Sequence, residues 1–178
     1  MAMNYRKCAE GIAARFTNIF RKEEVSKSCV EIVKKPVIRC SAGVIGQPVI
    51  GKVIPYTEIA DPTFATGILG QGVGIEPEDN VVYAPYDGEV SSIAESKHAV
   101  GITGRNDMEL LIHVGMDTVD MKGDGFEIFV TVGDKVKKGQ KLMTFDREKI
   151  KAAGHPETIA VLLTNSDDYD DVKFGDGI

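Results

Sequence analysis

The amino-acid sequence predicts an all-β fold: an antiparallel, barrel-like β-sandwich with one or two short helices and an N-terminal helical or flexible tail. Short apolar runs recur from about Val30 onward, and glycine or proline separates them at short intervals. The 178 residues include 19 glycines and 7 prolines, which implies many turns. Hydrophobic residues make up 43% of the chain, as is typical of a globular protein with a buried core.

Residues 1–28 differ from the remainder of the chain. Ile12, Phe16, Ile19 and Phe20 recur at helical spacing among basic side chains. This pattern predicts an amphipathic helix or a linker, and we expect it to pack on the domain rather than to lie on a membrane surface. We assign residues 1–28 to an N-terminal extension and residues 29–178 to one β domain.

The β domain is expected to contain a series of short strands and one internal helix. Strands are predicted, in chain order, at Val44–Ile45, Val49–Ile54, Val81–Tyr83, Glu89–Ile93, Val100–Thr103, Met108–Val114, Glu127–Val132, Lys141–Phe145 and Ile159–Leu163. The helix is predicted over Arg147–Ala153, because Asp146 can cap its start and Gly154 can end it.

Composition excludes several classes of protein. The 27 acidic and 21 basic side chains give a formal net charge of -6, which argues against nucleic acid as a partner. The cysteines, Cys8, Cys29 and Cys40, are odd in number and form no CxxC pair, which disfavours a disulfide framework and favours the cytoplasm. No apolar run approaches the roughly 18 residues of a membrane span, and no signal peptide is recognisable.

Two of the three histidines lie in a predicted hairpin. If the hairpin closes symmetrically about Arg105–Asn106, His98 and His113 face each other directly on one side of the sheet. A three-residue or five-residue loop would instead place them on opposite faces, because side chains alternate along a strand.

Two adjacent imidazoles suggest a phosphate site or a metal site. A phosphate site would use a neutral imidazole as nucleophile and a second donor for the transferring group. A metal site would need further ligands, for which Glu95, Glu109 and Asp117 are candidates. Two core histidines bonded to the backbone are the third alternative. No GxxxxGK[ST] loop is present, so phosphate handled here would pass between proteins rather than come from ATP.

Six short segments between about Val44 and Asn165 form a recognisable set: Asp61–Ala65, Ala84–Gly88, His98–Ala99, Glu109–Val119, Gly123–Phe126 and Gly133–Gly139. Together they resemble the enzyme IIA domain, glucose family, of the bacterial phosphoenolpyruvate-dependent sugar phosphotransferase system.

The resemblance implies a phosphotransferase that acts as a phosphohistidine relay in sugar uptake, within a IIA-type domain spanning residues 29–178. His113 would take the phosphoryl group on Nε2 from the histidine-containing phosphocarrier protein and pass it to a cysteine of a sugar-specific IIB domain. His98 would stabilise the phosphate, with Ser96 orienting it. A neutral His113 attacks through Nε2 only if Nδ1 holds the proton, so we expect a backbone carbonyl to accept from Nδ1.

The resemblance also implies a docking rim for partner proteins, no cofactor, and a cytoplasmic location peripheral to the IIB and IIC components of a membrane transporter. Asp61 and Asp117 would face basic side chains of the phosphocarrier. The apolar part of the rim would consist of Phe64, Ile68, Leu69, Leu111 and Val119.

Two other classes remain as alternatives. A biotin-type or lipoyl-type carrier uses turns like Gly133–Gly139 and would carry its group on Lys122. A zinc peptidase of related β architecture needs more histidine ligands than this chain supplies, although a regulatory zinc ion bound by His98 and His113 is compatible with the sequence. The third histidine, His155, is expected to be a surface or capping residue.

Overall fold

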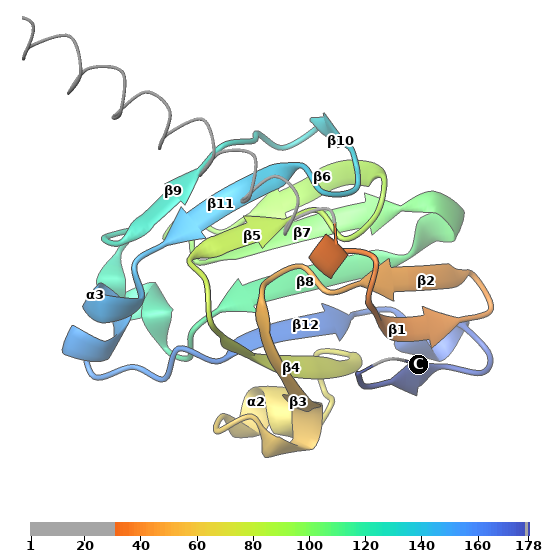
Figure 1. The fold of residues 1–178 in the computed structure, drawn as a ribbon, viewed down its shortest axis with the longest axis horizontal. Coiled ribbons are helices and arrows are strands. Elements are labelled where there is room, and N and C mark those ends of the chain that lie inside the picture. The colour runs from red at the N-terminus through yellow and green to blue at the C-terminus, as the bar shows by residue number, and fades with distance from the viewer. Residues whose placement is uncertain (1–30, 177) are drawn as a thin grey trace, which may run out of the picture.

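The computed structural model describes residues 31–176 and 178, and these residues form three antiparallel sheets (Figure 1). The large sheet contains, in spatial order, β10 (Lys135–Val136), β6 (Gly88–Ile93), β7 (Ala99–Gly104), β8 (Glu109–Val114), β12 (Ile159–Leu163), β4 (Gln71–Pro77) and β3 (Gly51–Pro55). One small sheet consists of β5 (Val81–Tyr83), β11 (Lys141–Phe145) and β9 (Phe126–Ile128), and the other of β13 (Lys173–Phe174), β1 (Pro36–Cys40) and β2 (Gly43–Gly46). The predicted all-β antiparallel sandwich is confirmed.

The main core lies between the large sheet and the two small ones. Strand alternation sets its composition: in β8, Leu110, Ile112 and Val114 are buried in the core, whereas Leu111 and His113 point to the other face. Leu142 and Met143 of β11 enter the same core from a small sheet. The outer face of the large sheet is therefore free to hold polar side chains.

Two α-helices occur among the described residues. Helix α3 (Arg147–Ala152) is the predicted one, and its cap is as expected, because the Asp146 carboxylate accepts from the backbone N–H of Lys149 at 3.1 Å. Helix α2 (Pro62–Ala65) was not assigned from the strand and helix patterns. It is a single turn, capped by Asp61 and opened by Pro62.

Strands β1, β4, β10 and β13 were missed by the sequence patterns, and several other strands differ from prediction at their ends. Strand β4 shows why. Its apolar pattern is interrupted by Gly72 and Gly74, which lie where neighbouring strands approach too closely for a side chain. A Cβ at Gly72 would be 1.9 Å from the carbonyl oxygen of Val161. These glycines serve strand packing and do not form a phosphate-binding loop.

The hairpin of β7 and β8 is out of the predicted register by one residue. Ala99, not His98, pairs with His113. The Gly104 N–H still donates to the Met108 carbonyl at 2.8 Å, so the loop is the odd-numbered run 105–107, in which Asn106 (φ 59°) and Asp107 (φ 58°) are left-handed. The prediction of direct pairing between the two histidines was therefore wrong.

The histidines nevertheless come together on one face. His98 precedes β7, so strict alternation along the strand does not govern where its side chain points. Lys97, immediately before it, has a φ of 58° and turns the chain, while the His98 carbonyl still accepts from the N–H of Val114. The predicted contact between the two imidazoles is therefore present, but it does not arise from direct pairing of His98 with His113.

The predicted amphipathic helix or linker at residues 1–28 lies outside the described residues, and the boundary at residue 29 stays a prediction. Among residues 31–176 and 178, no helix is both long enough and apolar enough to cross a membrane.

Candidate active site

His113 sits on the outer face of the large sheet between two small neighbours. Strand register places Ala99 of β7 on one side of it and Ala160 of β12 on the other. These are the smallest side chains that carry a Cβ, so the cross-strand neighbours of the imidazole contribute only methyl groups. Sequence reasoning missed both alanines. The predicted register put His98 in the place of Ala99, and the pairing of β8 with a strand almost fifty residues later, which brings in Ala160, has no local signal.

Two rings flank the His113 imidazole. The His98 ring lies edge-on, with ring centroids 4.6 Å apart and an interplanar angle of 76°. The Phe64 ring, from α2, lies with its centroid 4.8 Å from that of His113. Phe64 and Ala160 belong to a small apolar cluster that anchors α2 on the outer face of the sheet. The predicted histidine pair is therefore a direct contact, and Phe64, a predicted rim residue, packs against its His113 ring.

A backbone carbonyl fixes the tautomer of His113. Its Nδ1 lies 2.8 Å from the carbonyl oxygen of Gly115, and a carbonyl can only accept, so Nδ1 carries the proton. Gly115 has a φ of 73°, and a Cβ there would be 2.4 Å from Cγ2 of Thr118. The expected acceptor is present, and it leaves Nε2 with a free lone pair.

The electrostatic setting keeps His113 neutral. The pKa of His113 is lowered from the ordinary 6.5 to about 4, mainly by burial and secondly by the neighbouring His98. The Gly115 carbonyl and Asp61 partly offset these effects. Burial also lowers the pKa of His98. At neutral pH both rings are uncharged, and His113 has the protonation state that a nitrogen nucleophile requires.

Ser96 lies where the sequence predicted a hydroxyl group. Its Oγ is 2.7 Å from Nδ1 of the buried His98. If the hydroxyl donates to Nδ1, the other ring nitrogen, Nε2, carries a proton and becomes a donor. The Ser96–His98 pair can then present an N–H to a group held on His113.

The predicted docking residues differ in exposure. Ile68, Leu69 and Val119 are exposed at 79%, 40% and 55% of their surface. Leu111 is half-buried, on the same sheet face as His113 and two residues before it. Phe64 is buried and contacts His113, so it forms the floor of the rim more than its surface.

The two predicted docking acids differ from each other. Asp61 caps α2 by accepting from the backbone N–H of Thr63 at 2.7 Å, and it acts electrostatically on His113. Asp117 is exposed, has a left-handed φ of 57°, and begins the 3-10 helix η3 (Thr118–Met121) without using its side chain as a cap. Only the Asp117 carboxylate is thus entirely available to a partner.

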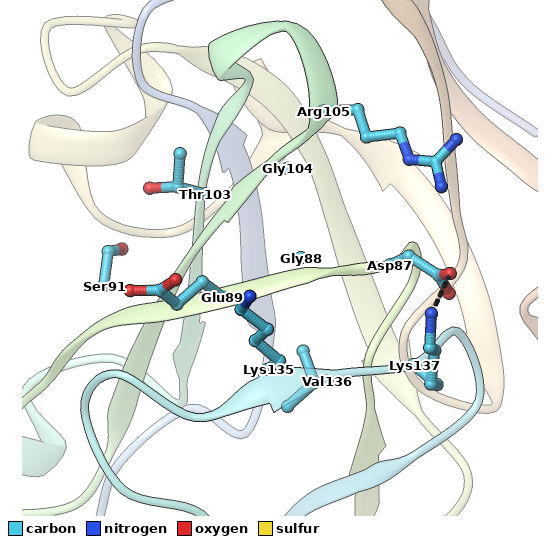
Figure 2. Close-up of a pocket in the computed structure, with 10 residues that line it drawn as sticks. All are labelled: Asp87, Gly88, Glu89, Ser91, Thr103, Gly104, Arg105, Lys135, Val136 and Lys137. Atoms are coloured by element: carbon cyan, nitrogen blue, oxygen red, sulfur yellow. Dashed lines mark hydrogen bonds and ion pairs between the residues drawn. The ribbon is translucent and has the colours of Figure 1, made fainter.

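Two of the surface cavities lie at the two ends of β7. A cleft of about 610 Å³ borders the pair and is lined by Ala94, Glu95, Ser96, His98, Val119 and Lys122. A groove of about 670 Å³ lies at the other end of β7, and Figure 2 shows its lining side chains, including Lys137 ion-paired to Asp87. Neither imidazole lines the groove. Within the described residues, no group of three or more His, Cys, Asp or Glu side chains is placed to hold a metal ion.

The described fold and site define the class: a small antiparallel β-sandwich domain with a paired-histidine site on the outer face of its large sheet. The profile of the family described as "phosphoenolpyruvate-dependent sugar phosphotransferase system, EIIA 1" matches residues 43–169. The chain belongs to this family, and the resemblance found in the sequence is confirmed.

Individual relatives agree with this assignment. The chain is 43% identical over 129 residues to the PTS system beta-glucoside-specific EIIBCA component of Bacillus subtilis (strain 168), covering 72% of this chain and 21% of the relative. It is 41% identical over 131 residues to the PTS system glucose-specific EIIA component of Bacillus cereus, covering 74% of this chain and 79% of the relative. The chain thus spans about a fifth of the first relative and most of the second.

A solved structure is also similar. Glucose permease IIA from Mycoplasma capricolum is 33% identical and superposes with a TM-score of 0.63, over 73% of this chain and 79% of that chain.

Proposed function

We propose that this domain is a phosphohistidine relay. It accepts a phosphoryl group on Nε2 of His113 from a histidine-containing phosphocarrier protein and passes it to a cysteine of a sugar-specific IIB domain. The observation that carries this proposal is the 2.8 Å contact between Nδ1 of His113 and the Gly115 carbonyl. It leaves Nε2 unprotonated beside a second imidazole, as nucleophilic attack on phosphorus requires.

Phosphoryl transfer depends mainly on positioning and charge stabilisation, and the site offers both. His113 is fixed by the Gly115 carbonyl and by the Phe64 ring. His98, oriented by Ser96, supplies an N–H for the phosphoryl oxygens. We assign His113 as the nucleophile and His98 with Ser96 as the stabilising pair.

The surroundings of the pair suit two successive partners. Exposed apolar side chains at Ile68, Leu69 and Val119 are typical of a transient protein interface, with Asp61 and Asp117 as acids for a basic phosphocarrier surface. The Bacillus subtilis relative is an EIIBCA component, a name that joins components B, C and A in one chain. This supports IIB and IIC components as the downstream partners, at the cytoplasmic side of a membrane transporter.

The family match does not favour the alternatives that the sequence left open. Lys122, the residue a carrier module would modify, is the C-cap of η3. A zinc peptidase would need a group of ligands beyond His98 and His113. A regulatory zinc ion on this pair stays a prediction that depends on ligands from a partner.

The test is incubation with phosphoenolpyruvate, the general first enzyme and the phosphocarrier protein, followed by mapping of an acid-labile, base-stable phosphate. We expect the phosphate on His113 and none in the His113→Gln variant. His98→Gln should accept phosphate but transfer it poorly to a IIB domain. His155→Gln is the matched control, because His155 lies just after α3 and is expected to have no part in transfer. Phosphorylation of the His113→Gln variant would overturn the assignment.

A further inference from the structure

The cleft of about 610 Å³ lies on the His98 side of the histidine pair. Ser96 and His98 line it, together with Val119 of η3 and Lys122 at the end of η3. His113 does not line the cleft, but its ring centroid is 4.6 Å from that of His98. A group held on His113 would therefore lie beside the His98 ring, which is part of the cleft lining.

Lys122, which lines the cleft, has a strained backbone conformation. Its φ of 51° and ψ of 32° are left-handed, a conformation that glycine adopts without strain and a lysine does not. The following residue, Gly123, also has a positive φ, of 90°. Lys97 shares this backbone conformation (φ 58°), so what distinguishes Lys122 is its place in the lining of the cleft.

The site needs positive charge once it is phosphorylated. A phosphoryl group on His113 adds negative charge where Asp61 already acts electrostatically on the ring, and His98 is neutral because burial lowers its pKa. Neither Lys97 nor Lys122 forms an ion pair in the part of the chain that the structure describes. Of these two lysines, only Lys122 lines the cleft.

The single acid in the lining is Glu95. No ion pair joins Glu95 to Lys122 among the described residues, so the ammonium group of Lys122 is available to another anion.

We propose that Lys122 binds the phosphoryl group carried by His113, its ammonium group donating to phosphoryl oxygens that enter the cleft. The inference rests on the proposed function, because it requires His113 to carry the group. An ammonium group suits this task as a compact charge with three donors, and a charge-assisted hydrogen bond to phosphate is among the stronger kinds.

The step in which Lys122 acts is a simple displacement. The lone pair on Nε2 of His113 forms a new N–P bond while the N–P bond of the phosphohistidine donor breaks, and the bonding pair stays on the donor nitrogen. The proton on Nδ1 of His113 remains hydrogen-bonded to the Gly115 carbonyl, so no proton leaves the ring. Lys122 supplies charge and hydrogen bonds and is itself unchanged.

The experiment compares Lys122→Gln with Lys97→Gln in the phosphotransfer assay. Lys97 is a matched control: it is exposed, has a left-handed φ of 58°, directly precedes His98 and does not line the cleft. Each variant loses one positive charge. If the two lysines acted only through the overall charge, removing either one would strengthen the attraction to a basic donor. Both variants would then accept phosphate at an equal or higher rate.

Loss of a phosphoryl contact predicts a different result. Lys122→Gln alone should accept phosphate more slowly and hold less of it at equilibrium, by roughly tenfold, as expected for one charge-assisted hydrogen bond. Lys122→Arg should restore most of the loss. Equal behaviour of the Lys122→Gln and Lys97→Gln variants would overturn the proposal, as would an equal loss in Lys122→Arg and Lys122→Gln.

Lys122→Gly separates phosphate binding from loop structure. Glycine relieves the left-handed strain, so the variant should unfold at an equal or higher temperature than the wild type while losing phosphate as Lys122→Gln does. A Lys122→Gly variant with wild-type transfer would contradict the proposal. The wild-type protein in the same assay tests the relay itself, because the proposed function fails if no phosphate appears on His113. If the wild type is phosphorylated and the Lys122→Gln variant is unaffected, only the role of Lys122 is refuted.

Discussion

Protonation of His113 should cost the folded protein measurable stability. The pKa of this side chain is about 4 in the folded state against an ordinary 6.5, so the unfolded chain binds the proton more tightly. Since each pKa unit corresponds to about 1.4 kcal/mol, charging the folded ring costs about 3 kcal/mol at most. Stability is thus highest above pH 6.5 and falls as the pH drops toward 4.

The effect can be isolated with the His113→Gln variant, which has no titrating group at this position. Between pH 7.5 and pH 5, the free energy of unfolding of the wild type should fall by about 2 kcal/mol more than that of the variant, because only the unfolded wild type takes up the proton over this range. Urea denaturation at several pH values measures the difference, and comparison with the variant cancels the titration of carboxylates common to both.

Nuclear magnetic resonance provides the direct check. The ring nitrogens of His113 should show the Nδ1–H tautomer at pH 7 and should not begin to protonate until the pH is well below 6. A midpoint near 6.5, or a proton on Nε2, would refute both the burial argument and the tautomer assigned from the Gly115 carbonyl.

Three further predictions concern the fold that holds the site. Asp146→Ala removes the cap of α3 and should lower the free energy of unfolding by about 1 kcal/mol, measured by urea denaturation. Gly72→Ala places a methyl group against the Val161 carbonyl and should cost about 1–3 kcal/mol, visible as a lower thermal midpoint. Tyr86→Phe removes a buried hydroxyl that donates to the Ile102 carbonyl at 2.8 Å and should cost about 1 kcal/mol in the same urea assay.

Each of these has a contrary outcome. Wild-type stability in Asp146→Ala would mean that the cap contributes nothing to α3. An unchanged thermal midpoint in Gly72→Ala would show that β4 and β12 can separate without cost. A more stable Tyr86→Phe variant would show that desolvation of the hydroxyl destabilises the fold by more than its hydrogen bond stabilises it.

Local patterns were sufficient for much of the fold. Strands β5, β11 and β12 occupy the predicted residues, because continuous apolar runs between turn residues are a local signal. Helix α3 was predictable from its cap for the same reason. Strand β4 was not, since its glycines are required by strands that pair with it from distant parts of the chain.

The histidine site divides in the same way. Residue types and short motifs were enough to select His98, His113 and Ser96 from the chain and to indicate the family. They were not enough to set the hairpin register, which the left-handed residues of the loop shift by one position. They also did not indicate Ala160, which comes to lie beside His113 through the pairing of β8 with β12.

The sequence therefore determines which side chains are in the candidate site, whereas the tertiary structure determines the protonation state and the surroundings of His113. Which side chain can act as a nucleophile is decided by its identity. The lowered pKa of His113 comes mainly from burial, the proton on its Nδ1 is held by the Gly115 carbonyl, and its small cross-strand neighbours are alanines on two paired strands. Desolvation and cross-strand packing depend on residues far apart in sequence, and such contacts exist only once the strands have paired.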